Sequence, residues 1–198
     1  MIFIRPTVLL ALAGAPLAAQ VPVEHSTLDG TVRKGTLSFD GRATTGAFSG
    51  TTTSVTGEMH GAGLAAVRGW VEAPVRTLGT GNQRRDRDLN KSMESDKYPT
   101  IRFELTGVTA PATPGDSVNV VLHGRFIIHG VTREASVPAS VVFHPEGIHV
   151  RGETPLNLKD YKIGGLSKAL GMLKMDEKIL VHVDLMLGAA ARSTQALH

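Results

Sequence analysis

The chain has 198 residues, a formal net charge of +3 and no cysteine. A charge this small cannot drive nucleic-acid binding through phosphate neutralisation, and the lack of thiols excludes a cysteine nucleophile and a cysteine-bound metal cluster. Because domains commonly contain roughly 100 to 200 residues, the length predicts one domain.

The first 19 residues have the layout of a secretory signal peptide. Arg5 precedes a short apolar run from Val8 to Ala13, and small residues follow at Ala18 and Ala19, which is the order of charge, apolar segment and cleavage site in such signals. The apolar run is much shorter than the about 20 residues that a membrane-spanning helix needs. We therefore predict a signal peptide at residues 1–19, a soluble mature domain at residues 20–198, and a periplasmic or secreted location.

The segment from Thr36 to Leu78 predicts strands that are partly exposed to solvent. Alternation is loose around Leu37 and Phe39, a polar and β-branched stretch follows at Thr51–Thr56, and strict alternation resumes over Val67–Leu78, as expected for a half-buried strand. Trp70, the one tryptophan of the chain, falls in this last run. We expect it at the mouth of a barrel.

The second half of the chain alternates more regularly. Ile101, Phe103 and Leu105 alternate with polar residues, a period of two that buries one face of a strand. Turn-forming pairs such as His129-Gly130 separate the runs. The predicted strands are Thr100–Val108, Val118–Ile128, Glu134–His144, Ile148–Leu158 and Lys178–Leu187. The fold class is therefore all-β, and we expect one closed antiparallel sheet.

Two segments interrupt the strand pattern. Gln83–Met93 is dense in charge and predicts a helical turn or ordered loop, in which the alternating charges of Arg84–Asp88 lie on a solvated face and brace the barrel. Leu166, Leu170 and Leu173 recur at helical spacing, which predicts a short amphipathic helix over Leu166–Met175. Such a helix would cap one end of the barrel.

Catalytic and metal-binding motifs are absent from the sequence. The chain has no nucleophile elbow, no His-Glu-x-x-His motif and no phosphate-binding loop, and its eight histidines lack the spacing of metal ligands. We therefore predict a protein that is not an enzyme and that uses no metal or cofactor. A hydrolase or isomerase that depends on His123 or Asp160 is kept as a rival hypothesis.

The interior of the predicted barrel is open to two interpretations. A barrel of about eight strands either fills with side chains or holds one small ligand. Small residues on the inward faces, namely Gly124, Ala135, Ala139 and Gly152, favour free space. From the residues alone, a ligand cavity and a solid core are equally supported.

Several motifs occur together in a characteristic order. They are Gly46-x-Phe48, Thr80-Gly81-Asn82 followed by Arg85-Asp86-x-x-Leu89, Tyr98-Pro99-x-Ile101-x-Phe103, Gly124-x-Phe126-x-Ile128-x-Gly130-Val131-Thr132, and Leu158-x-Asp160-Tyr161-x-Ile163-Gly164. Each motif alone is weak, but their order and spacing along nearly the whole mature chain are specific. In this arrangement the chain resembles the YceI-like family of periplasmic polyisoprenoid-binding proteins.

The resemblance implies a lipocalin-like, extended β-barrel over residues 20–198 with one or two short helices. It also implies an apolar tunnel for the binding, storage or transport of a long isoprenoid lipid such as an isoprenoid quinone, with that lipid as the only bound group. The implied partners are the isoprenoid lipid or quinone, a membrane redox protein and a second copy of the chain in a homodimer. The expected tunnel residues are Trp70, Ile101, Phe103, Leu105, Phe126, Ile128, Val137, Val141, Phe143, Leu156, Leu170 and Val183.

One alternative function is compatible with the resemblance. A solid-core module for envelope stress or protein interaction would share the fold and bind no ligand, because fold does not imply function.

Overall fold

The computed structural model describes residues 28–112, 117–164, 167–168 and 173–189. Its strands are β1 (Gly30–Ala43), β2 (Gly46–Thr52), β3 (Thr56–His60), β4 (Arg68–Pro74), β5 (Thr100–Thr109), β6 (Ser117–Ile128), β7 (Val131–His144), β8 (Gly147–Asn157), β9 (Ser167–Lys168), β10 (Leu173–Lys174) and β11 (Lys178–Ala189). The helix α1 spans Gln83–Ser92, and short 3-10 helices span Leu64–Ala66 (η1), Val75–Thr77 (η2) and Leu158–Tyr161 (η3). None of the described helices is long and apolar enough to cross a membrane.

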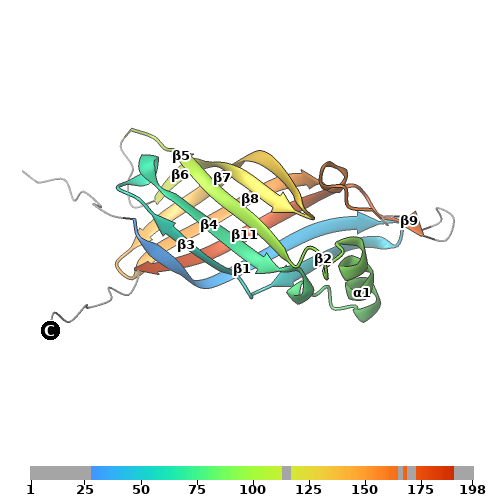
Figure 1. Ribbon diagram of the computed structural model, residues 1–198. Coiled ribbons are helices and arrows are strands. Elements are labelled where there is room, and N and C mark those ends of the chain that lie inside the picture. The colour runs from blue at the N-terminus through green and yellow to red at the C-terminus, as the bar shows by residue number, and fades with distance from the viewer. Residues whose placement is uncertain (1–27, 113–116, 165–166, 169–172, 190–198) are drawn as a thin grey trace, which may run out of the picture.

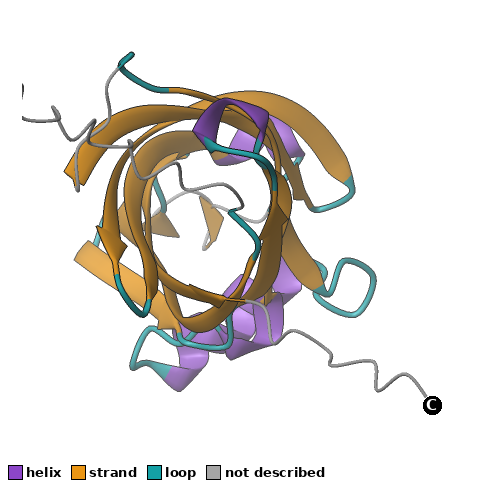
Figure 2. Ribbon diagram, turned by 90° about the vertical axis from the view of Figure 1, so that its left-hand side faces the viewer, coloured by secondary structure: helices purple, strands orange, loops and turns teal. Residues whose placement is uncertain are grey.

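Eight strands form a closed antiparallel ring, which confirms the predicted fold class. The order around the ring is β11-β8-β7-β6-β5-β4-β3-β1, and pairing of β1 with β11 closes it. Figure 1 shows an elongated barrel with α1 at one end, and Figure 2 shows the ring of strands viewed along its length. Closure leaves no free edge strand in the ring, a common way for sheet proteins to avoid edge-to-edge pairing.

The strand register turns one apolar face inward, as the alternation predicts. On β6, Val118, Val120 and Phe126 are buried, while Asn119 and Arg125 are exposed. The two-residue turn at His129-Gly130 joins β6 to β7 with positive φ at both residues, 53° and 72°, the backbone geometry of a tight hairpin. The five predicted strands of the second half are all present as β5, β6, β7, β8 and β11.

The end of the barrel away from α1 is closely packed. Val118 of β6, Val141 of β7, Val150 of β8 and Leu185 of β11 are all less than a tenth exposed and belong to one cluster. Side chains from these four strands pack together at this end.

Near α1, the strands β7 and β8 separate. Their pairing runs from His144 and Gly147 only as far as Ala139 and Gly152. The next residue of β7 is Pro138, which has no amide hydrogen to donate to a neighbouring strand. The 3-10 helix η3 lies beside the part of β7 that no longer pairs with β8. There the Arg133 Nε donates to the Asp160 carbonyl at 3.2 Å.

On another side of the same end, β2 pairs with a single strand in the described part of the chain, β1. Its other edge contacts Gly79, through two backbone hydrogen bonds with Thr51, and the Thr52 hydroxyl lies 2.7 Å from that of Thr77. The segment from η2 to α1 covers this side, as Figure 1 shows. The barrel is therefore wider at the α1 end, because strands diverge in two places and short helices replace strand pairing there.

The helix α1 confirms the helical interpretation of Gln83–Met93. The Asn82 side chain caps it by accepting from the amides of Arg84 and Arg85, both at 3.1 Å, as N-cap residues do. The Asp86 carboxylate accepts from the Thr80 amide at 2.8 Å. The Arg85 guanidinium lies 4.4 Å from the centre of the Phe48 ring on β2, so the charged segment contacts the barrel, and its bracing role stays a prediction.

The helix predicted at Leu166–Met175 is wrong where the structure describes this segment. Ser167–Lys168 and Leu173–Lys174 are antiparallel strands β9 and β10, and Met175 pairs with Ala43 at the tip of β1. Leu166 and Leu170 lie outside the described residues. Backbone pairing with another segment stabilises an extended conformation here. The helical spacing of three leucines could not predict this pairing, because it depends on residues elsewhere in the chain.

Candidate functional site

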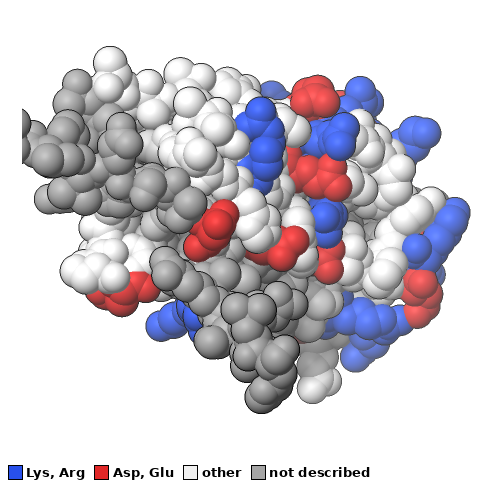
Figure 3. Space-filling view, turned by 60° about the vertical axis from the view of Figure 1, so that its left-hand side comes forward, with Lys and Arg blue, Asp and Glu red and all other residues white. Residues whose placement is uncertain are grey.

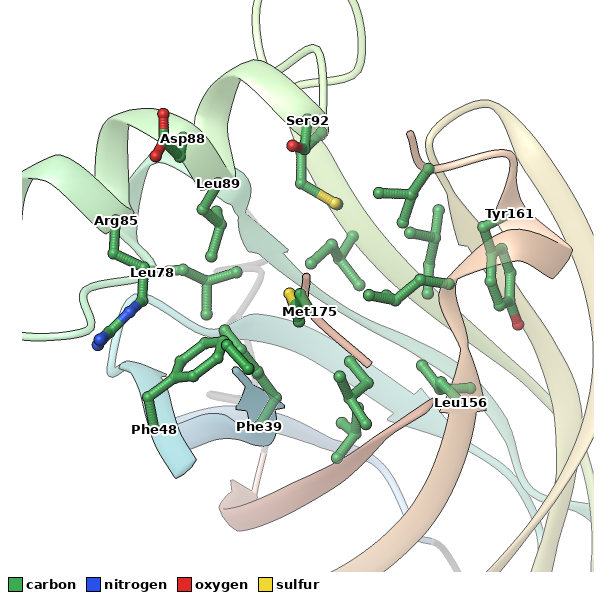
Figure 4. Close-up of a pocket in the computed structure, with 18 of the residues that line it drawn as sticks. Phe39, Phe48, Leu78, Arg85, Asp88, Leu89, Ser92, Leu156, Tyr161 and Met175 are labelled. Carbon is green, nitrogen blue, oxygen red and sulfur yellow. The ribbon is translucent and has the colours of Figure 1, made fainter. Parts of the chain in front are cut away.

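The wide end of the barrel contains an apolar cavity of about 280 Å³. Its walls come from β1, β2, β5, β6, β8 and β11, with α1 and η3 at the rim (Figure 4). The apolar lining residues are Leu37, Phe39, Ala43, Phe48, Leu78, Leu89, Met93, Ile101, Phe126, Ile128, Leu156, Leu158, Tyr161, Ile163, Met175, Ile179 and Val181. A cavity of this size and composition is typical of sites for small apolar ligands.

Polar groups gather at the rim of this cavity. Thr44 and Thr45 form the exposed turn between β1 and β2, and Arg85, Asp88 and Ser92 come from α1. Figure 4 shows Leu89 pointing from α1 toward the interior, while Asp88 points away from it. The cavity therefore has a polar, partly wet edge and an apolar interior.

A second cavity of about 130 Å³ lies deeper in the barrel. Phe103 and Leu105 of β5, Leu122 of β6, Val137 of β7 and Val183 of β11 are among its lining residues. The linings of the two cavities share Leu37, Ile101, Phe126 and Val181. These four shared side chains, called the constriction below, lie where the two spaces adjoin.

The structure brings most of the expected tunnel residues to these cavities. Ile101 and Phe126 line both cavities, Ile128 and Leu156 line the first, and Phe103, Leu105, Val137 and Val183 line the second. Their role in binding a lipid stays a prediction. Leu170 lies outside the described residues.

Trp70 is among the residues that line the second cavity, although its indole contacts polar side chains. Its Nε1 donates to the Glu58 carboxylate at 2.9 Å, and the Arg102 guanidinium lies 4.4 Å from the ring centre. Val71 and Ala73 on the same strand belong to the packed interior, so the alternation turns the Trp70 indole toward the outer face, and its role in binding a lipid stays a prediction.

Val141 and Phe143, two of the expected tunnel residues, line neither cavity. Val141 is 3% exposed within the packed end, and Phe143 packs against the same cluster. Sequence alternation identified them as inward-facing, but it cannot say which part of an interior is hollow.

The glycine at position 124 makes room for a side chain of the protein. A Cβ added there would lie 2.6 Å from the Phe103 Cζ and 2.2 Å from the Glu104 carbonyl oxygen. The Phe103 ring therefore covers Gly124, and its centre lies 4.8 Å from that of Phe126. The free space that we predicted at Gly124 is filled.

Several lining residues were missed by alternation alone. Phe39 and Phe48 come from the less regular first half, and Leu89, Tyr161 and Ile163 come from α1, η3 and the segment after it. Four of these five, all but Phe39, are fixed positions of the motifs quoted above. The motif positions were thus the available signal, because helices and loops at a barrel end carry no period of two.

The titratable groups do not form a catalytic cluster in the described part of the cavities. The first cavity has Tyr161 in its lining, and burial is the main cause that raises the pKa of its phenol. His123 and Asp160 line neither cavity. The His123 side chain is half-buried and lies between Thr109 and Ser136, with Nε2 2.8 Å from the Thr109 hydroxyl. No group of three potential metal ligands occurs among the described residues.

The outer face of β4, β5 and β6 carries paired charges. Arg102 lies 3.1 Å from the Glu72 carboxylate and 3.2 Å from that of Glu104, and Arg125 lies 2.9 Å from Glu104. The hydrogen bond from Arg125 is the main cause that lowers the pKa of Glu104. Figure 3 shows charges of both signs interleaved on one side of the barrel, with no patch of a single sign there.

Compared with known protein families, the chain matches the YceI-like domain over residues 20–187. None of the curated proteins matches the chain.

Solved structures share the fold at low identity. BcnA of Burkholderia cenocepacia superposes with a TM-score of 0.64 at 15% identity, over 76% of this chain and 94% of that one. A polyisoprenoid-binding domain from Saccharophagus degradans, implicated in plant cell wall breakdown, gives 0.66 at 14% identity, over 82% and 99%. The YceI protein of Campylobacter jejuni gives 0.57 at 14% identity, over 71% and 84%. At these identities the similarity establishes the fold.

Proposed function

We propose, from the premise that this chain belongs to the YceI-like family, that it binds an isoprenoid lipid in the cavity at the α1 end of the barrel. The finer proposal is a carrier or store for a long-chain isoprenoid, such as an isoprenoid quinone, in the periplasm. A membrane redox protein as partner and a homodimer as assembly belong to the same proposal.

The observation that carries this proposal is the contrast between the two ends of the barrel. At one end, closely packed side chains leave a cavity of about 130 Å³, while at the other the strands diverge around an apolar space of about 280 Å³. An unfilled apolar cavity loses dispersion contacts and is costly for a protein to maintain. A bound apolar chain would restore those contacts.

The hydrophobic effect is large enough to bind a lipid chain without a specific sequence motif. Burial of ten methylene groups contributes a gross free energy of about 8 kcal/mol, at about 0.8 kcal/mol each. Association costs an estimated 4–15 kcal/mol in lost freedom, so a chain longer than ten carbons is needed for tight binding. This arithmetic favours a long isoprenoid over a short terpene.

Two rivals from other classes predict different results. A solid-core interaction module would fill both ends of the barrel, which the first cavity argues against. A hydrolase or isomerase would need reactive groups facing its substrate, whereas His123 and Asp160 line neither cavity. Lipid binding is therefore the function that the geometry supports best.

The test is extraction of the protein from its native envelope fraction without detergent, followed by organic extraction and mass spectrometry. Leu89→Asp places a carboxylate at the lining of the first cavity, while Arg87→Asp puts the same group on an exposed position of the same helix. We expect a polyprenyl species at near one per native chain, unchanged in Arg87→Asp and reduced at least tenfold in Leu89→Asp, which corresponds to about 1.4 kcal/mol. Folded native protein without lipid would favour the interaction module.

A further inference from the structure

The side chains of the constriction come from opposite walls of the barrel. Leu37 and Val181 lie on the paired strands β1 and β11, and Ile101 and Phe126 lie on the paired strands β5 and β6. In the ring, β8 and β7 separate these pairs on one side and β4 and β3 on the other. The four side chains therefore face the interior from opposite walls.

Phe126 is the largest of the four and is held firmly in place. It is 9% exposed, and its direct cross-strand neighbour is Phe103. The two ring centres lie 4.8 Å apart, and the Phe103 ring in turn rests over Gly124. A ring packed against a second ring that is itself packed on backbone has little freedom to move aside.

Beyond the constriction the interior is apolar but divided from the first cavity. The second cavity extends along β11 from Val181 to Leu187, a strand length of roughly 20 Å at about 3.3 Å per residue. Its walls include Val150, Leu185 and Leu187 of the packed cluster, whereas Val118 and Val141 of that cluster do not line it. Lipid that entered through the rim near α1 would meet Phe126 before it reached this space.

We infer that the constriction sets the chain length of the bound isoprenoid, with Phe126 as the principal specificity-determining side chain. This inference rests on the proposed function. A chain whose tail ends at Phe126 fills the first cavity, and further isoprene units gain no burial in the native protein. Removal of the ring joins the two cavities and lets longer chains gain affinity.

The experiment measures the affinity of the purified full chain for a ladder of prenols, from farnesol through geranylgeraniol to solanesol. Native protein should gain affinity with each unit up to a limiting length, beyond which affinity changes by less than about twofold. Phe126→Leu should move this limit to longer prenols, with a gain of about tenfold at the first length beyond the native limit. Phe143→Leu makes the same change outside both cavities and should keep the native limit.

Two more variants keep the result interpretable. Val181→Ala opens the constriction from the opposite wall and should also move the limiting prenol length to longer chains. It provides the test if Phe126→Leu fails to fold. Val183→Phe, added to Phe126→Leu, fills the second cavity and should restore the native limit.

The outcomes separate the two proposals. A limit that stays at the native length in folded Phe126→Leu and Val181→Ala overturns the inference and leaves lipid binding intact. Native protein that binds no prenol of any length overturns both the inference and the proposed function.

Discussion

Replacement of Gly124 by alanine tests whether the space over this glycine belongs to the protein or to a ligand. The added Cβ would lie 2.2 Å from the Glu104 carbonyl oxygen and 2.6 Å from the Phe103 Cζ. Both separations are far below a normal contact, so the β5 backbone and the Phe103 ring must both shift.

The expected cost follows from these contacts. Overpacking of a well-packed interior costs typically about 1–3 kcal/mol, and the loss of glycine's freedom in the unfolded chain returns about 0.4–1 kcal/mol. We expect the free energy of unfolding to fall by roughly 1–2 kcal/mol, and Tm to fall by roughly 2–8 °C at about 2–4 °C per kcal/mol. Denaturant and thermal unfolding measure both quantities.

Gly107→Ala is the matched control, because a Cβ at Gly107 on β5 has no atom within 4 Å. It should leave stability within about 0.5 kcal/mol of native. Phe103→Leu combined with Gly124→Ala should recover part of the loss, with a coupling of about 0.5 kcal/mol or more. If Gly124→Ala keeps native stability and weakens only lipid binding, the space belongs to the ligand and our assignment of it to Phe103 is refuted.

Three further predictions concern the outer face, the helix and pH. Trp70→Phe should leave lipid affinity within about twofold of native, because the indole lies outside the barrel; a tenfold loss in a binding titration would restore Trp70 to the site. Asn82→Ala removes the cap of α1 and should lower the free energy of unfolding by about 1 kcal/mol in denaturant titration, whereas Asn82→Ser should retain most of it; equal losses would show that the cap contributes nothing. Arg125 lowers the pKa of Glu104, so this ion pair stabilises the protein above the ordinary glutamate pKa and loses that effect as pH falls through the lowered one. Glu104→Gln should therefore be up to about 1 kcal/mol less stable than native at neutral pH, and the difference should shrink in acid; a pH-independent difference would argue against the ion pair as its cause.

The alternation of side chains determined much of the barrel. Ile101, Phe103, Phe126 and Val183 were identified as inward-facing because a strand places successive side chains on opposite faces. A second local rule located the turn at His129-Gly130, because glycine accommodates positive φ.

The same rule failed where a residue's environment comes from distant strands. Val141 and Phe126 have the same inward pattern, yet one lies in the packed end and the other lines both cavities. Trp70 was assigned from its size, although its register on β4 faces it outward toward Glu58. At Leu166–Met175, leucine spacing predicted a helix, whereas β-pairing decided the conformation of the described parts.

The sequence by itself therefore determined the strands, their buried faces and, through the ordered motifs, the family. Only the tertiary structure decided where the interior is hollow, because that depends on where β7 leaves β8, on what covers β2, and on which rings meet across the barrel. Those are relations between residues far apart in the chain. A periodicity of two along one strand carries no information about them, since it is the same beside a cavity and inside a packed core.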